Sequence, residues 1–216
     1  MTHILHIDTS GTTGLVMIAR DGQPVKILYN QAERDHAGTI NTMIDKALAE
    51  TGLSLQDINA IAICSGPGSY TGLRIGMATV KGLAYALDLP VIAHNKLELL
   101  ADLQAIKKPR QYMVVLPARD GEYFVLSGAG DATPVHMITE DVNKSIWAID
   151  DISIFGQIGT DVKLPPATDY IATDTVIPGL WAILGFNDYL NNEFKNVASL
   201  EPMYIKSVFI HKKHNF

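Results

Sequence analysis

Two short loops rich in glycine, serine and threonine carry the residues best suited to bind a phosphate or a metal ion. The first, Asp8-Thr9-Ser10-Gly11, follows an apolar run, and its carboxylate and backbone N–H groups could hold Mg²⁺ and a phosphate. Alternatively, Asp8 and Ser10 stabilise the turn through hydrogen bonds from side chain to backbone. The second loop, 66–72, precedes a helical pattern, where free N–H groups and the helix dipole favour an anion. The candidate phosphate-loop residues are Asp8, Thr9, Ser10, Gly66, Gly68 and Gly72.

The second loop lacks the signatures of the two common phosphate-binding motifs. Gly72 is followed by Leu73-Arg74, whereas a Walker A loop needs Lys and then Ser or Thr at those positions. Its glycine spacing also differs from the dinucleotide-binding fingerprint, and the acidic residue expected about 20 positions further on is missing. The loop therefore either binds a phosphate-bearing ligand or serves as a rigid connector between a strand and a helix.

Side chains for nucleophilic or metal-assisted catalysis are sparse. Cys64 ends an apolar run with no histidine near it in sequence, so we interpret it as a structural thiol. His3 and His6 are three residues apart on a predicted strand and point to opposite faces, which excludes a shared metal ion. His36 has no second histidine at helical spacing, since position 40 is an isoleucine. We therefore expect no metal site and no catalytic residues, and nothing in the sequence supports a peptidase.

Composition and charge bound the class of protein. The 216 residues include 17 basic and 23 acidic side chains, one cysteine and 47% apolar residues, which fits a globular protein of one large or two small domains. A net charge of -6 argues against a surface that alone neutralises many phosphates, so we expect another subunit to hold any nucleic acid. No apolar run reaches the ~18 residues of a membrane span. We find no signal peptide and expect a cytoplasmic protein.

Hydrophobic periodicity predicts an α/β protein with a regular first half. Strands are expected over 3–7, 15–19 and 25–29, and the Asp21-Gly22 pair predicts a tight turn between the last two. The elements expected next are a helix over 37–48, a strand over 58–64, a helix over 73–87, a strand over 89–93 and a helix over 97–106. We predict an N-terminal lobe over 1–106 with the order β-β-β-α-β-α-β-α, and a smaller C-terminal lobe over 107–216.

The second half of the chain gives weaker signals and no internal repeat strong enough to assert. Strands are expected over 112–116, 123–126, 135–138 and 152–156, and a helix over 181–192. Glu140 and Asp141 are expected to be solvated carboxylates in a loop.

The predicted helix over 73–87 is apolar around most of its circumference, which indicates burial on more than one side. Its charged residues, Arg74 and Lys81, share a narrow stripe with Ala78 and Tyr85. Small residues at positions 78, 82 and 86 form a ridge that allows another helix to approach closely. The helix either packs entirely within this chain or docks partly on another subunit.

Several of these motifs together resemble the TsaB (YeaZ) family. They are Ile7-Asp8-Thr9-Ser10, the segment 65–76 with the sequence SGPGSYTGLRIG, Lys81-Gly82-Leu83-Ala84 and the closing segment 201–206, EPMYIK. The resemblance implies an actin-like ATPase fold of the ASKHA, ribonuclease H-like class in two lobes. It also implies a part in making threonylcarbamoyladenosine on tRNA.

The resemblance further implies a non-catalytic subunit that binds no cofactor alone. Its expected partners are a TsaD-like catalytic subunit and a TsaE-like ATPase, with tRNA bound only through the complex and any nucleotide at the boundary with the partner subunit. Pairing is expected through the first two helices, and the isolated chain is expected to form a homodimer through the same surface. The expected interface residues are Met43, Lys46, Ala78, Lys81 and Tyr85.

One position departs from the family pattern. The family usually has Asp-Ala-Arg where this chain has Pro117-Ala118-Arg119, so a carboxylate that kinases of this fold place at the second phosphate loop is missing. The alternative function is a stand-alone ATPase or small-molecule kinase that uses Asp8 and the loop 66–72.

Overall fold

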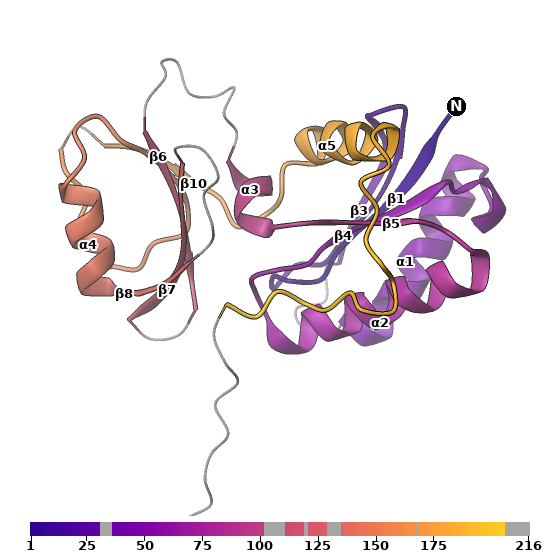
Figure 1. Ribbon diagram of the computed structural model, residues 1–216, viewed down its shortest axis with the longest axis horizontal. Helices are drawn as coiled ribbons and strands as arrows, with labels where there is room; N and C mark the ends of the chain where they lie inside the picture. The colour runs from indigo at the N-terminus through magenta and orange to yellow at the C-terminus, as the bar shows by residue number, and fades with distance from the viewer. Residues whose placement is uncertain (31–35, 102–110, 119–120, 129–134, 167, 206–216) are drawn as a thin grey trace, which may run out of the picture.

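Two lobes, each built on a five-stranded sheet, make up the computed structural model of the protein (Figure 1). The structure describes residues 1–30, 36–101, 111–118, 121–128, 135–166 and 168–205. No helix in these ranges is both long and apolar enough to cross a membrane.

The first sheet has the strand order β3-β2-β1-β4-β5. Its strands are β1 (His3–Asp8), β2 (Leu15–Arg20), β3 (Gln23–Tyr29), β4 (Ala60–Cys64) and β5 (Val91–His94). β1, β2 and β3 form an antiparallel meander, and β4 and β5 run parallel to β1. Asp21 and Gly22 both have positive φ values, as the tight turn predicted between β2 and β3 requires.

Helices cover both faces of the first sheet (Figure 1). On one face lie α1 (His36–Thr51) and α2 (Tyr70–Leu87), and β1 turns Leu5 and Ile7 toward them. On the other face lies α5 (Pro178–Leu190), whose Trp181 packs into a second apolar cluster with Ile4. β1, β2, β4 and β5 are therefore buried on both sides, which explains their nearly continuous apolar sequences, whereas the edge strand β3 is only partly buried. The short elements of this half are the 3₁₀ turn η1 (Leu55–Asp57) and α3 (Lys96–Leu100).

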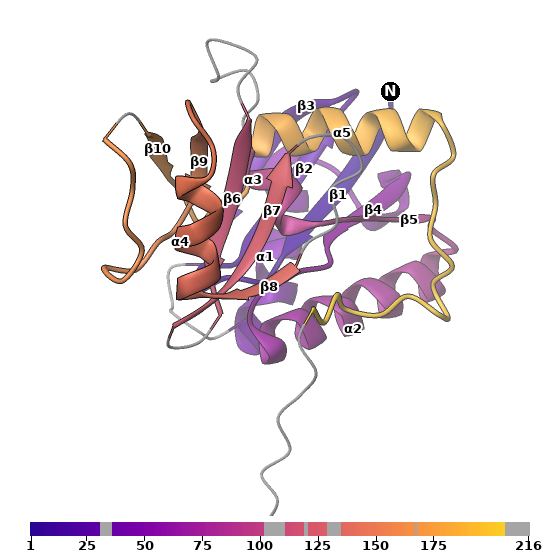
Figure 2. The same cartoon turned by 60° about the vertical axis from the view of Figure 1, so that its left-hand side comes forward.

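The second sheet repeats the topology of the first. Its strands are β6 (Tyr112–Pro117), β7 (Glu122–Gly128), β8 (Val135–Ile138), β9 (Ser153–Gly156) and β10 (Asp169–Ala172), in the order β10-β9-β6-β7-β8. β6, β7 and β8 form a meander, a helix α4 (Thr139–Trp147) follows, and β9 returns parallel to β6. α4 and α3 pack on opposite faces of this sheet (Figure 2). The predicted two-lobed, actin-like α/β fold is thereby confirmed.

The first lobe is built from both ends of the chain. α5 follows the second sheet in sequence but packs on the first, and Lys195 then forms a β-bridge with Val91. Further on, the Met203 N–H donates to the Ser65 carbonyl at 2.7 Å. The predicted division after residue 106 falls at positions outside the described residues and stays a prediction. α5, which that division assigns to the second lobe, covers the first sheet because its apolar side faces the core around Trp181.

The structure differs from the sequence-based expectations at four places. The expected loop at Glu140 and Asp141 is wrong, because both lie in the first turn of α4, where the helix dipole favours carboxylates. α2 begins at Tyr70, before the expected residue 73, since the Ser69 side chain caps it by accepting from the Gly72 N–H. The strand β10 was not expected. The expected continuous helix over 97–106 is wrong, because α3 begins at Lys96 and ends at Leu100, where Ala101 adopts an extended conformation; residues 102–106 lie outside the described ranges.

Candidate functional site

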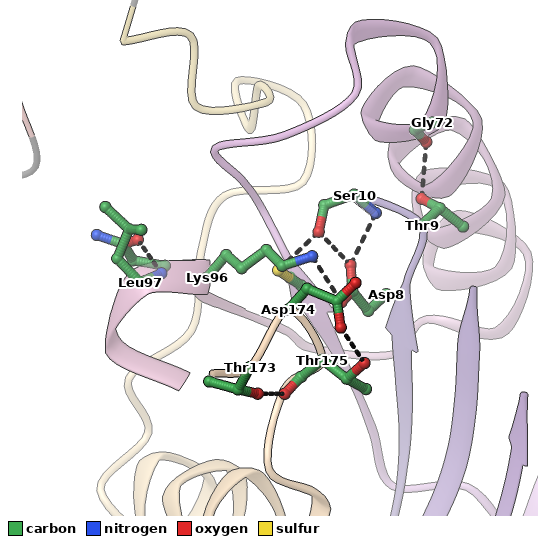
Figure 3. Close-up of polar contacts among 11 residues, drawn as sticks. Asp8, Thr9, Ser10, Gly72, Lys96, Leu97, Thr173, Asp174 and Thr175 are labelled. Atoms are coloured by element: carbon green, nitrogen blue, oxygen red, sulfur yellow. Dashed lines mark hydrogen bonds and ion pairs between the residues drawn. The ribbon is translucent and has the colours of Figure 1, made fainter. Parts of the chain in front are cut away.

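Three loops meet at one edge of the first sheet. β1, β4 and β5 are parallel, so their carboxyl ends, Asp8, Cys64 and His94, lie on the same edge. In open α/β sheets, this edge is where ligands bind. Figure 3 shows the side chains that gather there, from the first loop, from the start of α2 and from Lys96 at the start of α3. The structure therefore brings the two predicted loops together.

The first loop is held by its own side chains. The Asp8 side chain is buried, and its Oδ1 accepts hydrogen bonds from the Ser10 backbone N–H at 2.7 Å and from Ser10 Oγ at 2.5 Å. The Thr9 hydroxyl donates to the Gly72 carbonyl at 2.7 Å, which ties the first loop to the start of α2 (Figure 3). These are the turn-stabilising contacts of the alternative interpretation given above. One oxygen of Asp8 is thus already committed within the loop.

The glycines of the second loop permit close contact with the first. A Cβ atom at Gly68 would lie 2.3 Å from the Ser10 carbonyl oxygen, and one at Gly76 would lie 2.3 Å from Thr9 Oγ1. The Ser69 N–H donates to the Ser10 carbonyl at 2.7 Å. Gly66 has a φ of 114°, a conformation that L side chains rarely adopt. The glycine pattern therefore agrees with a rigid connector packed against the first loop.

Lys96 is a site residue that the sequence analysis missed. Its side chain is only 4% exposed, and its Nζ lies 3.8 Å from Asp8 Oδ2, which is equally buried (Figure 3). A Cβ atom at Gly11 would lie 3.0 Å from this Nζ, so the ammonium group sits directly against the first loop. The Lys96 backbone N–H donates to the Gly66 carbonyl at 2.7 Å. Lys96 therefore joins all three loops. A lysine after an apolar strand carries no signal for such a role in the sequence.

Cys64 is a buried, neutral thiol. Its Sγ lies 3.6 Å from Ser10 Oγ, and burial, followed by the negative charge of Asp8, raises the pKa of the thiol far above its ordinary value. A thiol held in this form is a poor nucleophile, because the thiolate is the reactive species. The interpretation of Cys64 as a structural residue agrees with this environment. Among the described residues, no three His, Cys, Asp or Glu side chains form a metal-binding group.

An actin-like fold implies Mg²⁺ and a nucleotide in this crevice, but the residues present do not fit them. Asp8 gives one oxygen to Ser10 and turns the other toward an ammonium group. β6 occupies in the second sheet the place of β1 in the first, and it ends at Pro117 where β1 ends at Asp8. The second lobe thus has a proline at the position equivalent to that carboxylate. Asp174 lies in the same close-up, but it is exposed and accepts from Thr175 Oγ1 at 3.0 Å.

Most of the apolar surplus of α2 is used within the chain itself. Leu73, Met77, Val80 and Ala84 are buried in the first lobe. Ile75 and Leu83 are partly buried against the same core, to which Val197 and Leu200, just before the closing segment, also contribute. Internal packing, one of the two readings left open above, therefore explains these positions.

The closing segment and the residues just before it cover one side of α2. The Tyr204 ring lies 5.2 Å from that of Tyr70, and Arg74 stacks 4.4 Å above Tyr70 while its Nε donates to Tyr204 Oη at 3.3 Å. Lys81 Nζ donates to the carbonyl oxygen of Ala198 at 3.2 Å. The two charged residues of the predicted stripe are thus engaged by this chain.

The described part of the chain leaves a narrow stripe along α2 uncovered. Ala78, Gly82 and Ala86 are exposed, and the Tyr85 side chain beside them is 90% exposed. A Cβ atom added at Gly82 would have no neighbour within 4 Å. We refer to these four residues as the α2 stripe. Ala78 and Tyr85 of the expected interface belong to it.

The two expected interface residues of α1 lie beside a groove. Lys46 is exposed and forms an ion pair with Glu50, and Met43 is partly buried against the core of the first lobe. Both line a groove of about 580 Å³ between α1 and β3. The structure places all five expected interface residues on α1 and α2.

Comparison with known proteins places this chain in a family. The family model described as "TsaD: tRNA N6-adenosine threonylcarbamoyltransferase" matches residues 27–146. The tRNA threonylcarbamoyladenosine biosynthesis protein TsaB of Haemophilus influenzae is 40% identical over 238 residues, covering 97% of this chain and 96% of that protein. The chain belongs to the TsaB family. The TsaB protein of Escherichia coli is 36% identical over 122 residues, which cover 56% of this chain and 52% of that protein.

A solved structure supports the TsaB assignment. YeaZ from Pseudomonas aeruginosa superposes with a TM-score of 0.76 at 26% identity, covering 94% of this chain and 100% of that one. The resemblance found in the sequence motifs is confirmed.

Proposed function

We propose that this chain takes part in tRNA threonylcarbamoyladenosine biosynthesis as a non-catalytic scaffold that pairs with a TsaD-like catalytic subunit. The pathway is supported by membership of the TsaB family, whose curated relatives carry that name. The observation that carries the non-catalytic role is the Asp8–Lys96 pair, which fills the crevice where an actin-like enzyme needs a metal. The chain then contributes a surface rather than a reaction.

The α2 stripe supports pairing through α1 and α2. Small residues allow a partner helix to approach closely, and an exposed tyrosine among them is typical of an interface hot spot. The match to the TsaD family model spans both helices, so a TsaD-like subunit has related elements to offer. Two related helix pairs can meet around a local twofold axis, the arrangement that most dimers use.

Replacing Ala78 by glutamate tests this surface. Ala78 is exposed in the isolated chain, so the variant should fold normally, but in the complex it would bury an unpaired charge. We expect its affinity for the TsaD-like subunit to fall at least 100-fold, about 3 kcal/mol, in calorimetry or co-purification. The matched control is Ala148→Glu, an exposed alanine of the second lobe, which should change the affinity less than twofold. Unchanged pairing of the Ala78 variant would show that the interface lies elsewhere.

Tyr85→Ala offers a graded version of the same test. The side chain is 90% exposed, so its loss should leave the free energy of unfolding within about 0.5 kcal/mol. Removing a hot-spot tyrosine should weaken pairing by about 2 kcal/mol, or roughly 30-fold. If Tyr85→Ala lowered the free energy of unfolding as much as the free energy of pairing, Tyr85 would support the fold and not the interface.

The other members of the assembly follow from the same proposal. A TsaE-like ATPase joins the pair, tRNA is held through the complex, and any nucleotide lies at the boundary between the subunits. Without its partner, the chain forms a homodimer through the α2 stripe, since an uncovered patch associates. Sedimentation equilibrium should then show a dimer for the native chain and a monomer for Ala78→Glu.

Calorimetry with Mg-ATP separates the scaffold from the alternative, a stand-alone ATPase or kinase. The isolated chain is expected to show no binding. Micromolar affinity with turnover that depends on Asp8 would instead establish an enzyme.

A further inference from the structure

The Asp8–Lys96 pair consists of two opposite charges in a site nearly closed to water. Both side chains are 4% exposed, and their charged atoms lie 3.8 Å apart. A buried charge is strongly unfavourable unless an opposite charge accompanies it. Asp8 can therefore be buried as a charged group because Lys96 lies beside it, and Lys96 can be buried because of Asp8.

The position of the ammonium group is fixed by the backbone around it. The Lys96 N–H donates to Gly66 and the preceding residue, Asn95, caps α3 through its side chain, which accepts from the Leu97 N–H at 2.9 Å. On the opposite side, the Cα of Gly11 leaves only enough room for a hydrogen, since a Cβ would lie 3.0 Å from Nζ. Glycine at position 11 thus makes space for the lysine head group.

The Lys96 ammonium group lies on the side of Asp8 where a cation bound by this carboxylate would lie. It lies at the carboxyl ends of parallel strands, next to a carboxylate whose Oδ2 points away from its own loop (Figure 3). Mg²⁺ and Mn²⁺ require several oxygen ligands around them. Here the groups around Asp8 include an ammonium, which repels cations, the neutral thiol of Cys64, a poor ligand for such ions, and the Ser10 hydroxyl, which already donates to the other oxygen of Asp8.

We propose that Lys96 is the internal counter-ion of this crevice: its ammonium group takes the place of a divalent cation at Asp8 and prevents one from binding. With Lys96 present, Asp8 pairs with the ammonium group of this chain. Without Lys96, Asp8 is free to bind a divalent cation from solution. This inference deepens the proposed scaffold role at the same site. Its test measures metal binding by the isolated chain, whereas the scaffold test measures pairing, so either can fail without the other.

The experiment measures Mn²⁺ binding to the isolated full-length chain by calorimetry. Lys96→Ala removes the ammonium group and leaves space beside Asp8. We expect it to bind one Mn²⁺ per chain at least tenfold more tightly than the native protein. The double variant Lys96→Ala/Asp8→Asn should lose that gain. Lys163→Ala, which removes one positive charge from an exposed site in the second lobe, controls for net charge and should behave as the native chain.

Thermal unfolding provides a second readout. Mn²⁺ should raise the melting temperature of Lys96→Ala, because the ion neutralises a carboxylate left alone, and should not raise that of the native chain. Equal affinity in Lys96→Ala and the native protein, or a gain that survives Asp8→Asn, would overturn the proposal.

A measurement on the native protein keeps the test independent of the variants' folding. Mn²⁺ bound at Asp8 would broaden the amide NMR signals of residues 8–11. At millimolar Mn²⁺, we expect these signals to stay sharp in the native chain, and selective broadening would refute the exclusion of the cation. If Lys96→Ala does not fold, Lys96→Gln keeps a polar group in the site and replaces it in the binding experiments.

Discussion

Acidification should destabilise this protein through a histidine in its core. His6 lies on β1 and is completely buried, with its ring edge-on to Trp181 at a centroid distance of 5.0 Å. Its Nδ1 lies 3.1 Å from the Ile4 carbonyl, and its Nε2 has no hydrogen-bond partner among the residues that the structure describes. Gly185 of α5 leaves room for the ring, since a Cβ there would lie 2.8 Å from Nε2. Burial lowers the pKa of His6 to about 3.

His6 takes up a proton at a different pH in the folded and in the unfolded chain. An unfolded histidine has a pKa of about 6.5, so between that value and 3 the unfolded chain binds a proton that the native chain does not. The free energy of unfolding therefore falls as the pH falls through this window. At 1.36 kcal/mol per pH unit, His6 alone removes about 2 kcal/mol between pH 7 and pH 5 and about 4 kcal/mol by pH 3. Burial also lowers the pKa of His94, which acts in the same direction.

Urea unfolding at pH 7 and pH 5 measures the contribution of His6. The unmutated protein should lose about 2 kcal/mol more than His6→Leu over this interval, because only the unmutated protein has a histidine at position 6 that takes up a proton when the chain unfolds. Ile18→Val, a substitution in the neighbouring strand β2, is the control for a perturbed core and should keep the full loss. If His6→Leu loses as much stability as the native chain, the histidine does not carry the pH dependence.

Two further predictions concern the packing of the first lobe. Gly76→Ala should lower the free energy of unfolding by about 1–3 kcal/mol, since its Cβ would lie 2.3 Å from Thr9 Oγ1. Gly82→Ala on the same helix should raise it by about 0.5–1 kcal/mol in thermal unfolding, and equal effects of the two substitutions would contradict this packing. Trp181→Phe should cost about 1–3 kcal/mol, because the indole N–H donates to His94 Nδ1 at 3.0 Å and its loss leaves a buried acceptor. Denaturant titration checks that cost, and native-like stability would show that the hydrogen bond contributes little.

The regular half of the fold was predictable because local patterns agree with it. α1 has apolar residues at helical spacing, β1–β3 are short apolar runs separated by turn residues, and the turn at Asp21-Gly22 has the residues that its φ values need. The sequence also carries a helical pattern for α4: its buried residues, Val142 and Ile146, are four positions apart. β10 has the sequence Asp-Tyr-Ile-Ala and contains no fully buried residue, so it lacks the apolar run by which the other short strands are recognised.

The site itself depends on contacts between distant parts of the chain. The candidate loops were found from residue type, but their meeting rests on parallel pairing of β1, β4 and β5. Lys96 and Asp8 neutralise each other only after that pairing, and a solvated lysine would have the same sequence. The sequence shows that α2 has more apolar residues than one buried face needs. It does not show which of them residues 197–204 cover and which remain exposed in the α2 stripe. Residue type indicates which interactions a side chain is able to make. The pairing of distant strands determines which of these interactions form.

The discontinuous first lobe has a consequence for synthesis on the ribosome. α1, α2 and the strands beneath them leave the exit tunnel well before α5, which closes the opposite face of their sheet. At ~5–20 residues per second, that face stays exposed for roughly 5–20 s while the second lobe is translated. The second sheet is continuous in sequence and is free to form during that wait. The nascent chain is therefore most vulnerable to misassembly and proteolysis just before its last helix emerges.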